Sequence, residues 1–138
     1  MYTKVGRNQH TALLDTATQI TDLLNIDELM NNTGQILDLL AELAGKLDVH
    51  LAMEDEILYP KLLKQSDEKI QSITKDFIAE MGGIENAFHD YQKKWSNYSE
   101  IQNDPERFIK RTKAVFNVLA ERIKKEEQIM YKIIDDLM

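Results

Sequence analysis

The stretch of sequence that decides the fold is His50-Leu-Ala-Met-Glu54-Asp-Glu-Ile-Leu-Tyr59-Pro60. Steps of three and four residues through it follow one face of a helix, and this face is apolar except at His50 and Glu54. The residues on the face are Ile36, Leu40, Leu43, Leu47, His50, Glu54 and Ile57. An ionised carboxylate on such a face costs several kcal/mol unless a cation meets it. The pattern therefore predicts a buried cationic partner for Glu54, and a metal ion is the first candidate.

A weaker copy of this stretch lies near the C-terminus, in Arg122-Ile-Lys-Lys-Glu126-Glu-Gln-Ile-Met-Tyr131-Lys132. A glutamate, an isoleucine and a tyrosine recur in it at the spacing of the first stretch. Its inward face is predicted to comprise Phe108, Thr112, Val115, Leu119, Arg122, Glu126, Ile129 and Ile133. Two helices thus carry a polar pair at the same depth of an apolar face, and Arg122 stands where the first copy has His50.

Composition limits both the size of the fold and the chemistry of any site. A chain of 138 residues, 43% of them hydrophobic, is enough for one core, so we predict a single domain over residues 1–138. The net charge of −7, with basic residues interspersed among acids, disfavours nucleic acid as a partner. The absence of cysteine excludes disulfides, thiolate zinc sites and iron–sulfur clusters. Any metal must therefore be held by nitrogen and oxygen atoms.

Neither a signal peptide nor a membrane span is predicted. The N-terminal residues contain no apolar core of a signal peptide, and no run of about 18 apolar residues occurs. We therefore expect a soluble, cytoplasmic protein with no membrane partner. Only 5 glycines and 2 prolines are present, which favours an all-α fold of long helices.

Four long amphipathic segments joined by short links predict an up-down-up-down antiparallel four-helix bundle. Asn32 and Gln35 resemble the capping pair of the second helix, Ser66 is the expected cap of the third, and Asp104-Pro105 opens the fourth. Residues 97–103 are expected to form a loop. The predicted helices cover residues of about 4–24, 33–60 (extending at most to 65), 67–96 and 105–137.

The bundle brings several polar residues to one end. His10 lies on the apolar face of the first helix and is predicted to reach the level of His50 and Glu126. His89 lies late in the third helix, which places it at the opposite end if the helices are equal in length and in register. Simpler interpretations remain open, since Glu85 can pair with His89 on the surface and His10 can be a partly exposed histidine packed under a loop.

Together these motifs resemble the hemerythrin-like, or HHE cation-binding, domain family over essentially the whole chain. In that family a four-helix bundle binds a non-haem di-iron centre, and the resemblance implies that the third-helix histidine joins the same cluster. It implies terminal metal ligands at His10, His50 and His89 and bridging carboxylates at Glu54 and Glu126. Arg122 departs from the family, because it matches the position of a fourth-helix histidine and a guanidinium has no lone pair to give a metal.

Two functional hypotheses follow. The first is a hemerythrin-like protein that binds iron and a small diatomic ligand, with a role in oxygen, nitric oxide or iron binding, sensing or handling; imidazole and carboxylate ligands also permit manganese, cobalt or zinc. Its centre is expected to be asymmetric, with fewer than two tightly bound metals. The second is a degenerate bundle that acts as a structural or protein-interaction module, in which Arg122 neutralises Glu54 and Glu126. No nucleophile–base pair or phosphate loop supports an enzyme, and we assign Tyr59 and Tyr131 to the core.

Overall fold

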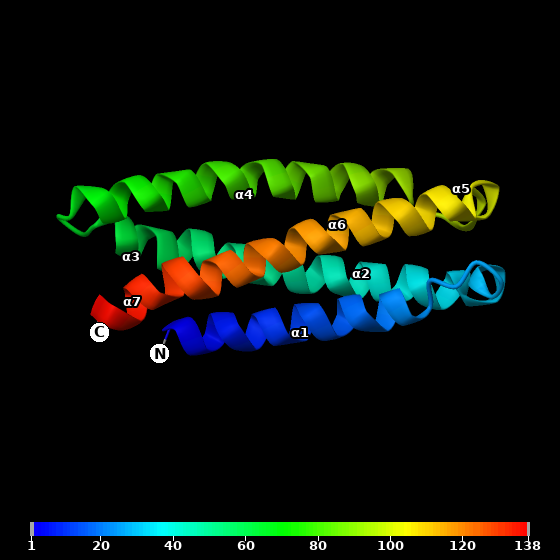
Figure 1. Ribbon diagram of the computed structural model, residues 1–138, viewed down its shortest axis with the longest axis horizontal. Coiled ribbons are helices and arrows are strands. Elements are labelled where there is room, and N and C mark those ends of the chain that lie inside the picture. The colour runs from blue at the N-terminus through cyan, green and yellow to red at the C-terminus, as the bar shows by residue number, and fades with distance from the viewer. Residues whose placement is uncertain (1, 138) are drawn as a thin grey trace.

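A computed structural model describes residues 2–137, and within this range the chain is all-helical with no strand, which confirms the predicted all-α class. The long elements lie alongside one another, and α1 begins at the same end of the molecule at which α7 ends (Figure 1). The α-helices in chain order are α1 (Tyr2–Asp22), α2 (Leu29–Met53), α3 (Tyr59–Leu63), α4 (Glu68–Lys94), α5 (Tyr98–Asn103), α6 (Pro105–Lys125) and α7 (Tyr131–Leu137). No helix in the described range is long and apolar enough to cross a membrane.

Two π-helical segments, η1 (Glu54–Leu58) and η2 (Glu126–Met130), continue α2 and α6 without a break. The Tyr59 N–H donates to the carbonyl of Glu54, five residues earlier, and the Tyr131 N–H donates in the same way to Glu126. Such segments are rare and often lie at functional sites. Here each one begins at a glutamate that the sequence places on an inward face.

The π segments correct the predicted inward faces beyond the two glutamates. Ile57 and Ile129 were expected to be buried but are 41% and 38% exposed, whereas Leu58 and Met130 are buried. A π turn contains one residue more than an α turn, so every residue after it is displaced by one position around the helix. The same displacement buries Ile134 in place of the expected Ile133.

The predicted starts of the second and third helices need correction. The second helix begins at Leu29, after Glu28, whose side chain makes no capping hydrogen bond, so the expected cap at Asn32 falls inside the helix. Asp67, not Ser66, caps α4, because the Asp67 carboxylate accepts hydrogen bonds from two backbone N–H groups of the first turn.

The remaining boundary and the last link follow local capping chemistry. Residues 97–103 are not a loop throughout, since Asn97 accepts from the backbone N–H of Glu100 and starts the short helix α5. The prediction for Asp104-Pro105 is confirmed: Asp104 accepts from the N–H of Arg107, and Pro105 occupies the first turn of α6.

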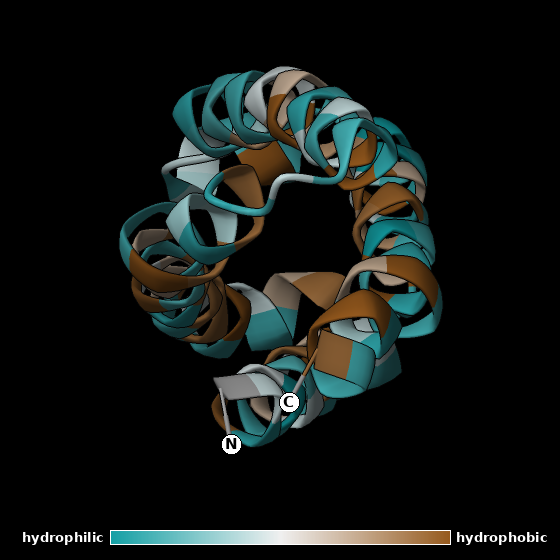
Figure 2. Ribbon diagram, turned by 90° about the vertical axis from the view of Figure 1, so that its left-hand side faces the viewer, coloured by the Kyte–Doolittle hydropathy of each residue, from teal (hydrophilic) through white to brown (hydrophobic). Residues whose placement is uncertain are grey.

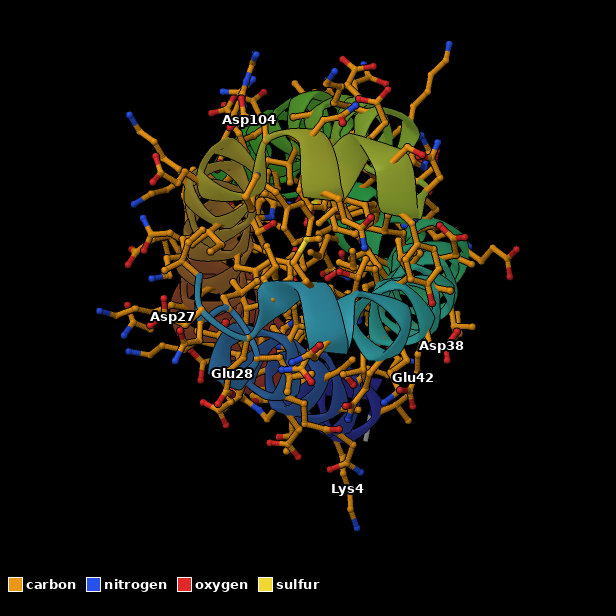
Figure 3. All side chains as sticks on the ribbon, turned by 90° about the vertical axis from the view of Figure 1, so that its right-hand side faces the viewer. Lys4, Asp27, Glu28, Asp38, Glu42 and Asp104 are labelled. Atoms are coloured by element: carbon orange, nitrogen blue, oxygen red, sulfur yellow. The ribbon has the colours of Figure 1, made fainter. Side chains whose placement is uncertain are left out.

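The apolar core consists of two clusters with a polar layer between them. Leu47 and Leu119 belong to the larger cluster, and Leu58 and Met130 belong to the smaller one. Viewed end-on, the helices surround a common axis (Figure 2). From the opposite end, side chains fill the space around this axis while the labelled charged residues point outward (Figure 3). The polar layer consists of buried residues and so lies away from solvent: His10, His50, Glu54, Arg122 and Glu126.

Candidate metal centre

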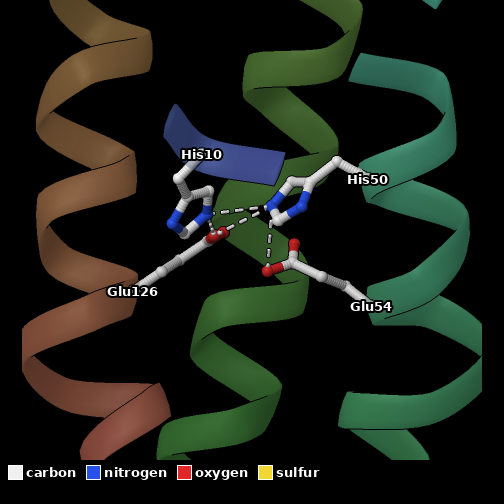
Figure 4. Close-up of side chains that lie close together, drawn as sticks. All are labelled: His10, His50, Glu54 and Glu126. Atoms are coloured by element: carbon white, nitrogen blue, oxygen red, sulfur yellow. Dashed lines mark hydrogen bonds and ion pairs between the residues drawn. The ribbon is translucent and has the colours of Figure 1, made fainter. Parts of the chain in front are cut away.

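Four polar side chains from three segments of the chain converge in the polar layer (Figure 4). Each offers one nitrogen or oxygen atom, and these atoms all lie within 4.8 Å of one another. Each side chain is almost completely buried. The four residues are His10 of α1, His50 of α2, and the first residues of the two π segments, Glu54 and Glu126.

The closest contacts join the two imidazoles and Glu126. His10 Nε2 lies 3.0 Å from His50 Nε2 and 2.9 Å from Glu126 Oε1. His50 Nε2 is 3.3 Å from both Glu126 Oε1 and Glu54 Oε2. We call these four atoms the donor cluster; they are small, hard or borderline ligands gathered around one point.

Hydrogen bonds on the outer side of each ring fix its tautomer. The Nδ1–H of His50 donates to Gln9 Oε1 at 2.7 Å, and the Nδ1–H of His10 donates to Glu127 Oε2 at 3.1 Å. With Nδ1 protonated, the neutral form of each ring directs the Nε2 lone pair into the cluster. Two lone pairs that face each other across 3.0 Å require a positive centre between or beside them, which is either a proton or a metal ion.

The pKa values of the cluster show how it is balanced without metal. Burial alone would lower the pKa of His50, but hydrogen bonds to Glu126 and Glu54 outweigh it and raise the pKa to about 9. Burial raises the pKa of Glu54 above its ordinary value, against the effect of its hydrogen bond with His50. For Glu126, burial would raise the pKa, but its contacts with the His10 and His50 rings outweigh burial and hold the pKa well below the usual range. The metal-free cluster therefore retains a proton on His50.

Two tyrosines complete the surroundings of Glu54. The Tyr131 hydroxyl donates to Glu54 Oε2 at 3.3 Å, and the Tyr59 hydroxyl lies 3.4 Å from Glu54 Oε1. The Tyr131 ring also stacks on His10, with ring centroids 5.1 Å apart. Burial, together with the Glu54 charge, raises the pKa of both phenols, so they remain donors. Sequence reasoning missed this role.

Arg122 lies inside the bundle beside the donor cluster and is only 2% exposed. Its Nε–H donates to Glu126 Oε2 at 2.8 Å, and Nη2 donates to the Phe77 carbonyl at 3.0 Å and to the Tyr59 hydroxyl at 3.1 Å. Nη1 makes no hydrogen bond; it is 3.7 Å from a carboxylate oxygen of Glu80. The guanidinium is thus held in place by groups from three helical segments.

The structure does not bring His89 to the donor cluster, contrary to what the resemblance implies. His89 is exposed on α4, outside the convergent group. At the level of the cluster α4 presents Phe77, whose carbonyl accepts from Arg122. His89 lies twelve residues further along the helix, a rise of about 18 Å. The bundle geometry, in which a late residue of the third helix lies far from this end, explains the difference.

The donor set fits a metal ion. Two imidazole nitrogens with inward lone pairs and two carboxylate oxygens suit divalent first-row metals such as iron, manganese, cobalt or zinc. The outer hydrogen bonds from the histidines to Gln9 and Glu127 are of the kind that orients metal ligands in proteins. The arrangement can therefore hold a cation at a dry, negatively charged point inside the bundle.

Comparison with known proteins agrees with this geometry. The family model described as the Hemerythrin HHE cation binding domain matches residues 4–134, which confirms the resemblance inferred from the motifs. No curated protein and no solved structure matches the chain.

Proposed function

The chain belongs to the hemerythrin HHE cation-binding family, and from this premise we propose that it binds a metal ion through His10, His50, Glu54 and Glu126. The observation that carries the proposal is the facing pair of imidazole Nε2 atoms, each fixed by an outer hydrogen bond on Nδ1. We also propose that residues 1–138 form one domain and that the bundle has the up-down-up-down, antiparallel topology of four long helical segments.

We propose iron as the metal and a small diatomic molecule, dioxygen or nitric oxide, as its ligand. Bound iron would supply redox chemistry and a position for such a molecule. The chain itself contributes a dry site, two neutral imidazoles, two carboxylates and a phenol, Tyr131, whose hydroxyl points at Glu54 Oε2. The role that follows is binding or sensing of the diatomic molecule, or iron handling.

An apolar hollow that begins one helical turn away from the site is compatible with a small, uncharged ligand. It has a volume of ≈ 140 Å³ and is lined by apolar side chains of α2, α4 and α6. Leu47 and Leu119, which line it, lie one helical turn before His50 and Arg122. A molecule of the size and polarity of dioxygen fits such a space, whereas a charged substrate would lose its hydration there.

The proposal is tested by metal retention. Wild type loaded with Fe²⁺ without oxygen and then desalted should keep the metal, while His50→Ala and Glu54→Ala should lose most of it. His89→Ala is the matched control, because it removes a histidine that the structure places outside the cluster, and it should keep the wild-type amount. If wild type retains neither iron nor, in the same experiment, manganese, cobalt or zinc, the proposal is overturned. Full retention of metal by His50→Ala would also overturn it.

A second function is favoured by one contact, the 2.8 Å ion pair between Arg122 and Glu126. This pair neutralises a buried carboxylate without metal, as a purely structural bundle requires. Thermal unfolding separates the two functions. A metal present at about 100 times its dissociation constant stabilises by roughly 2.7 kcal/mol, which raises Tm by on the order of 5–10 °C. An unchanged Tm after chelation would favour the structural module.

A further inference from the structure

We infer that the centre holds one metal ion per chain, and that the Arg122 guanidinium occupies the position in which a second cation would bridge Glu54 and Glu126. This inference rests on the proposed function, because it specifies how many metals that site takes. It concerns the side of the two carboxylates that faces away from the donor cluster.

Each carboxylate divides its two oxygens between two sides. Glu126 directs Oε1 to the histidines and Oε2 to Arg122 Nε. Glu54 directs Oε2 to His50 and Oε1 to the Tyr59 hydroxyl. Carboxylates arranged in this way can serve two positive centres, one on each side. The near side has two imidazoles to complete a metal site, but the far side has a guanidinium.

In the described part of the chain, the far side has no group of three or more histidine and acidic side chains placed to hold a metal. The groups that meet there are the guanidinium, the Tyr59 hydroxyl, and the carbonyl and ring of Phe77. Among residues 2–137, the only group of three or more histidine or acidic side chains placed to hold a metal is the one on the near side. At this level α4 contributes the ring and carbonyl of Phe77 and the carboxylate of Glu80, which is already paired with Lys125, so a second metal would lack a histidine from that helix.

The guanidinium is locked in this position. Three hydrogen bonds hold it, and its central carbon lies 4.5 Å from the centroid of the Phe77 ring. The planar fork of arginine suits the separate acceptors that it meets, whereas a lysine ammonium would act as a point charge. On the outer side, Glu80 faces Nη1 at 3.7 Å and is itself paired with Lys125 at 2.8 Å. A metal could take this position only if the guanidinium, with its fixed positive charge, moved out of it.

The same arrangement gives the remaining metal unequal carboxylate ligands. Glu126 shares its charge with Arg122 through Oε2, so its Oε1 is the weaker electron donor. Glu54 has only neutral tyrosine hydroxyls as further partners. We expect a single metal ion, with Glu126 as its weakest ligand and three stronger ligands: His10, His50 and Glu54.

The number of ions is measured by titrating metal-free protein with Co²⁺, whose visible absorption depends on its ligands, and by elemental analysis after desalting. Wild type should show one break at one equivalent and retain one ion per chain. Arg122→His, which exchanges the fixed cation for an imidazole, should retain a second, weaker equivalent with a changed spectrum. Arg111→His makes the same exchange at an exposed position of α6 and should stay at one.

Each outcome decides between the proposals. Two tightly held ions in wild type would overturn this inference while leaving the proposed function intact. No retained ion in wild type would overturn the proposed function itself, and with it this inference. If Arg122→His is folded by circular dichroism and still takes one ion, the guanidinium is not what excludes the second. If that variant does not fold, the wild-type stoichiometry alone still decides.

Discussion

His10 Nε2 and His50 Nε2 lie 3.0 Å apart in the interior of the bundle, with one carboxylate oxygen of Glu126 within 3.3 Å of both. Because the outer nitrogen of each ring is occupied by an acceptor, this contact is possible only when a positive charge is present. In the metal-free protein that charge is a proton on His50, and a bound metal has to displace it.

Metal affinity should therefore increase with pH. The pKa of His50 in the folded, metal-free protein is raised to about 9, so below that pH metal binding releases one proton. We expect the Co²⁺ dissociation constant to fall close to tenfold per pH unit between about pH 7.5 and 8.5, above the raised pKa of Glu54 and below that of His50, measured by competition with a chelator of known pH dependence. A dissociation constant that is independent of pH would contradict the assignment.

The raised pKa of His50 acts in the opposite direction on the stability of the metal-free protein, which should decrease as pH rises. A raised histidine pKa contributes stability that is fully present below the unfolded value of about 6.5 and is lost as pH rises through about 9. Thermal unfolding of the chelated protein should thus show a contribution from His50 that declines across this window. His50→Gln should lack that contribution, which makes it the control.

Removal of the outer partner of His50 should weaken the site without removing a ligand. Gln9→Ala leaves His50 Nδ1–H without the acceptor that now lies 2.7 Å away. Loss of such a partner typically costs about 10–100-fold in metal affinity. Gln19→Ala, at an exposed position of the same helix, should leave the Co²⁺ affinity unchanged. Equal affinities for the two variants would show that the outer hydrogen bond does not orient the ring.

Arg122→Gln should strongly destabilise the metal-free protein. It leaves Glu126 buried with less positive charge nearby, and breaking a buried ion pair from one side costs about 3–5 kcal/mol. Urea unfolding after chelation measures this loss. Arg111→Gln removes the same charge from an exposed position of α6 and should change stability by no more than about 0.5 kcal/mol. A loss as small as that of the control would show that the buried pair is dispensable.

Gly6 should be required for the position of Tyr131. A Cβ added at Gly6 would overlap the Tyr131 hydroxyl, which contacts both Glu54 and His10. Gly6→Ala should destabilise by about 1–3 kcal/mol and weaken metal binding, because the tyrosine has to move. The effect should shrink only in part when Tyr131→Phe removes the hydroxyl, because two carbons of the ring would also lie within 3.0 Å of the added Cβ, as a double-mutant cycle would show.

The control for Gly6 is Gly45, where an added Cβ meets nothing within 4 Å. Gly45 lies inside α2, so Gly45→Ala should stabilise by about 0.5–1 kcal/mol through helix propensity. If both glycine substitutions stabilise, the close approach of α1 to Tyr131 is not tight.

Helical periodicity was sufficient to predict the long helices and the inward position of His50 and Glu54, because ideal α geometry holds up to Glu54. It failed beyond that residue, since nothing in a three-four pattern marks a π turn. The repeated five-residue spacing from glutamate to tyrosine was the available signal, because in a π segment these two residues share a face.

The position of His89 could not be settled by periodicity either. The spacing along a helix says which face a residue takes but not how far the helix is shifted along its neighbours. The resemblance implied a position of α4 along its neighbours that would bring His89 to the cluster. The contact between Arg122 and the Phe77 carbonyl shows that α4 is positioned differently in this chain.

The π segments also make this protein unusual in how it would respond to the loss of a residue. In Glu54–Leu58 the chain completes one turn with an extra residue, and Ile57 in that turn points to solvent. Deletion of Ile57 would place Tyr59 four residues after Glu54, so an ordinary α turn would still bury both. In most helices such a deletion turns the following core residues away from the core. Here they would still face inward, and the main change would be in the backbone at Glu54. The extra residue therefore belongs to the site more than to the fold.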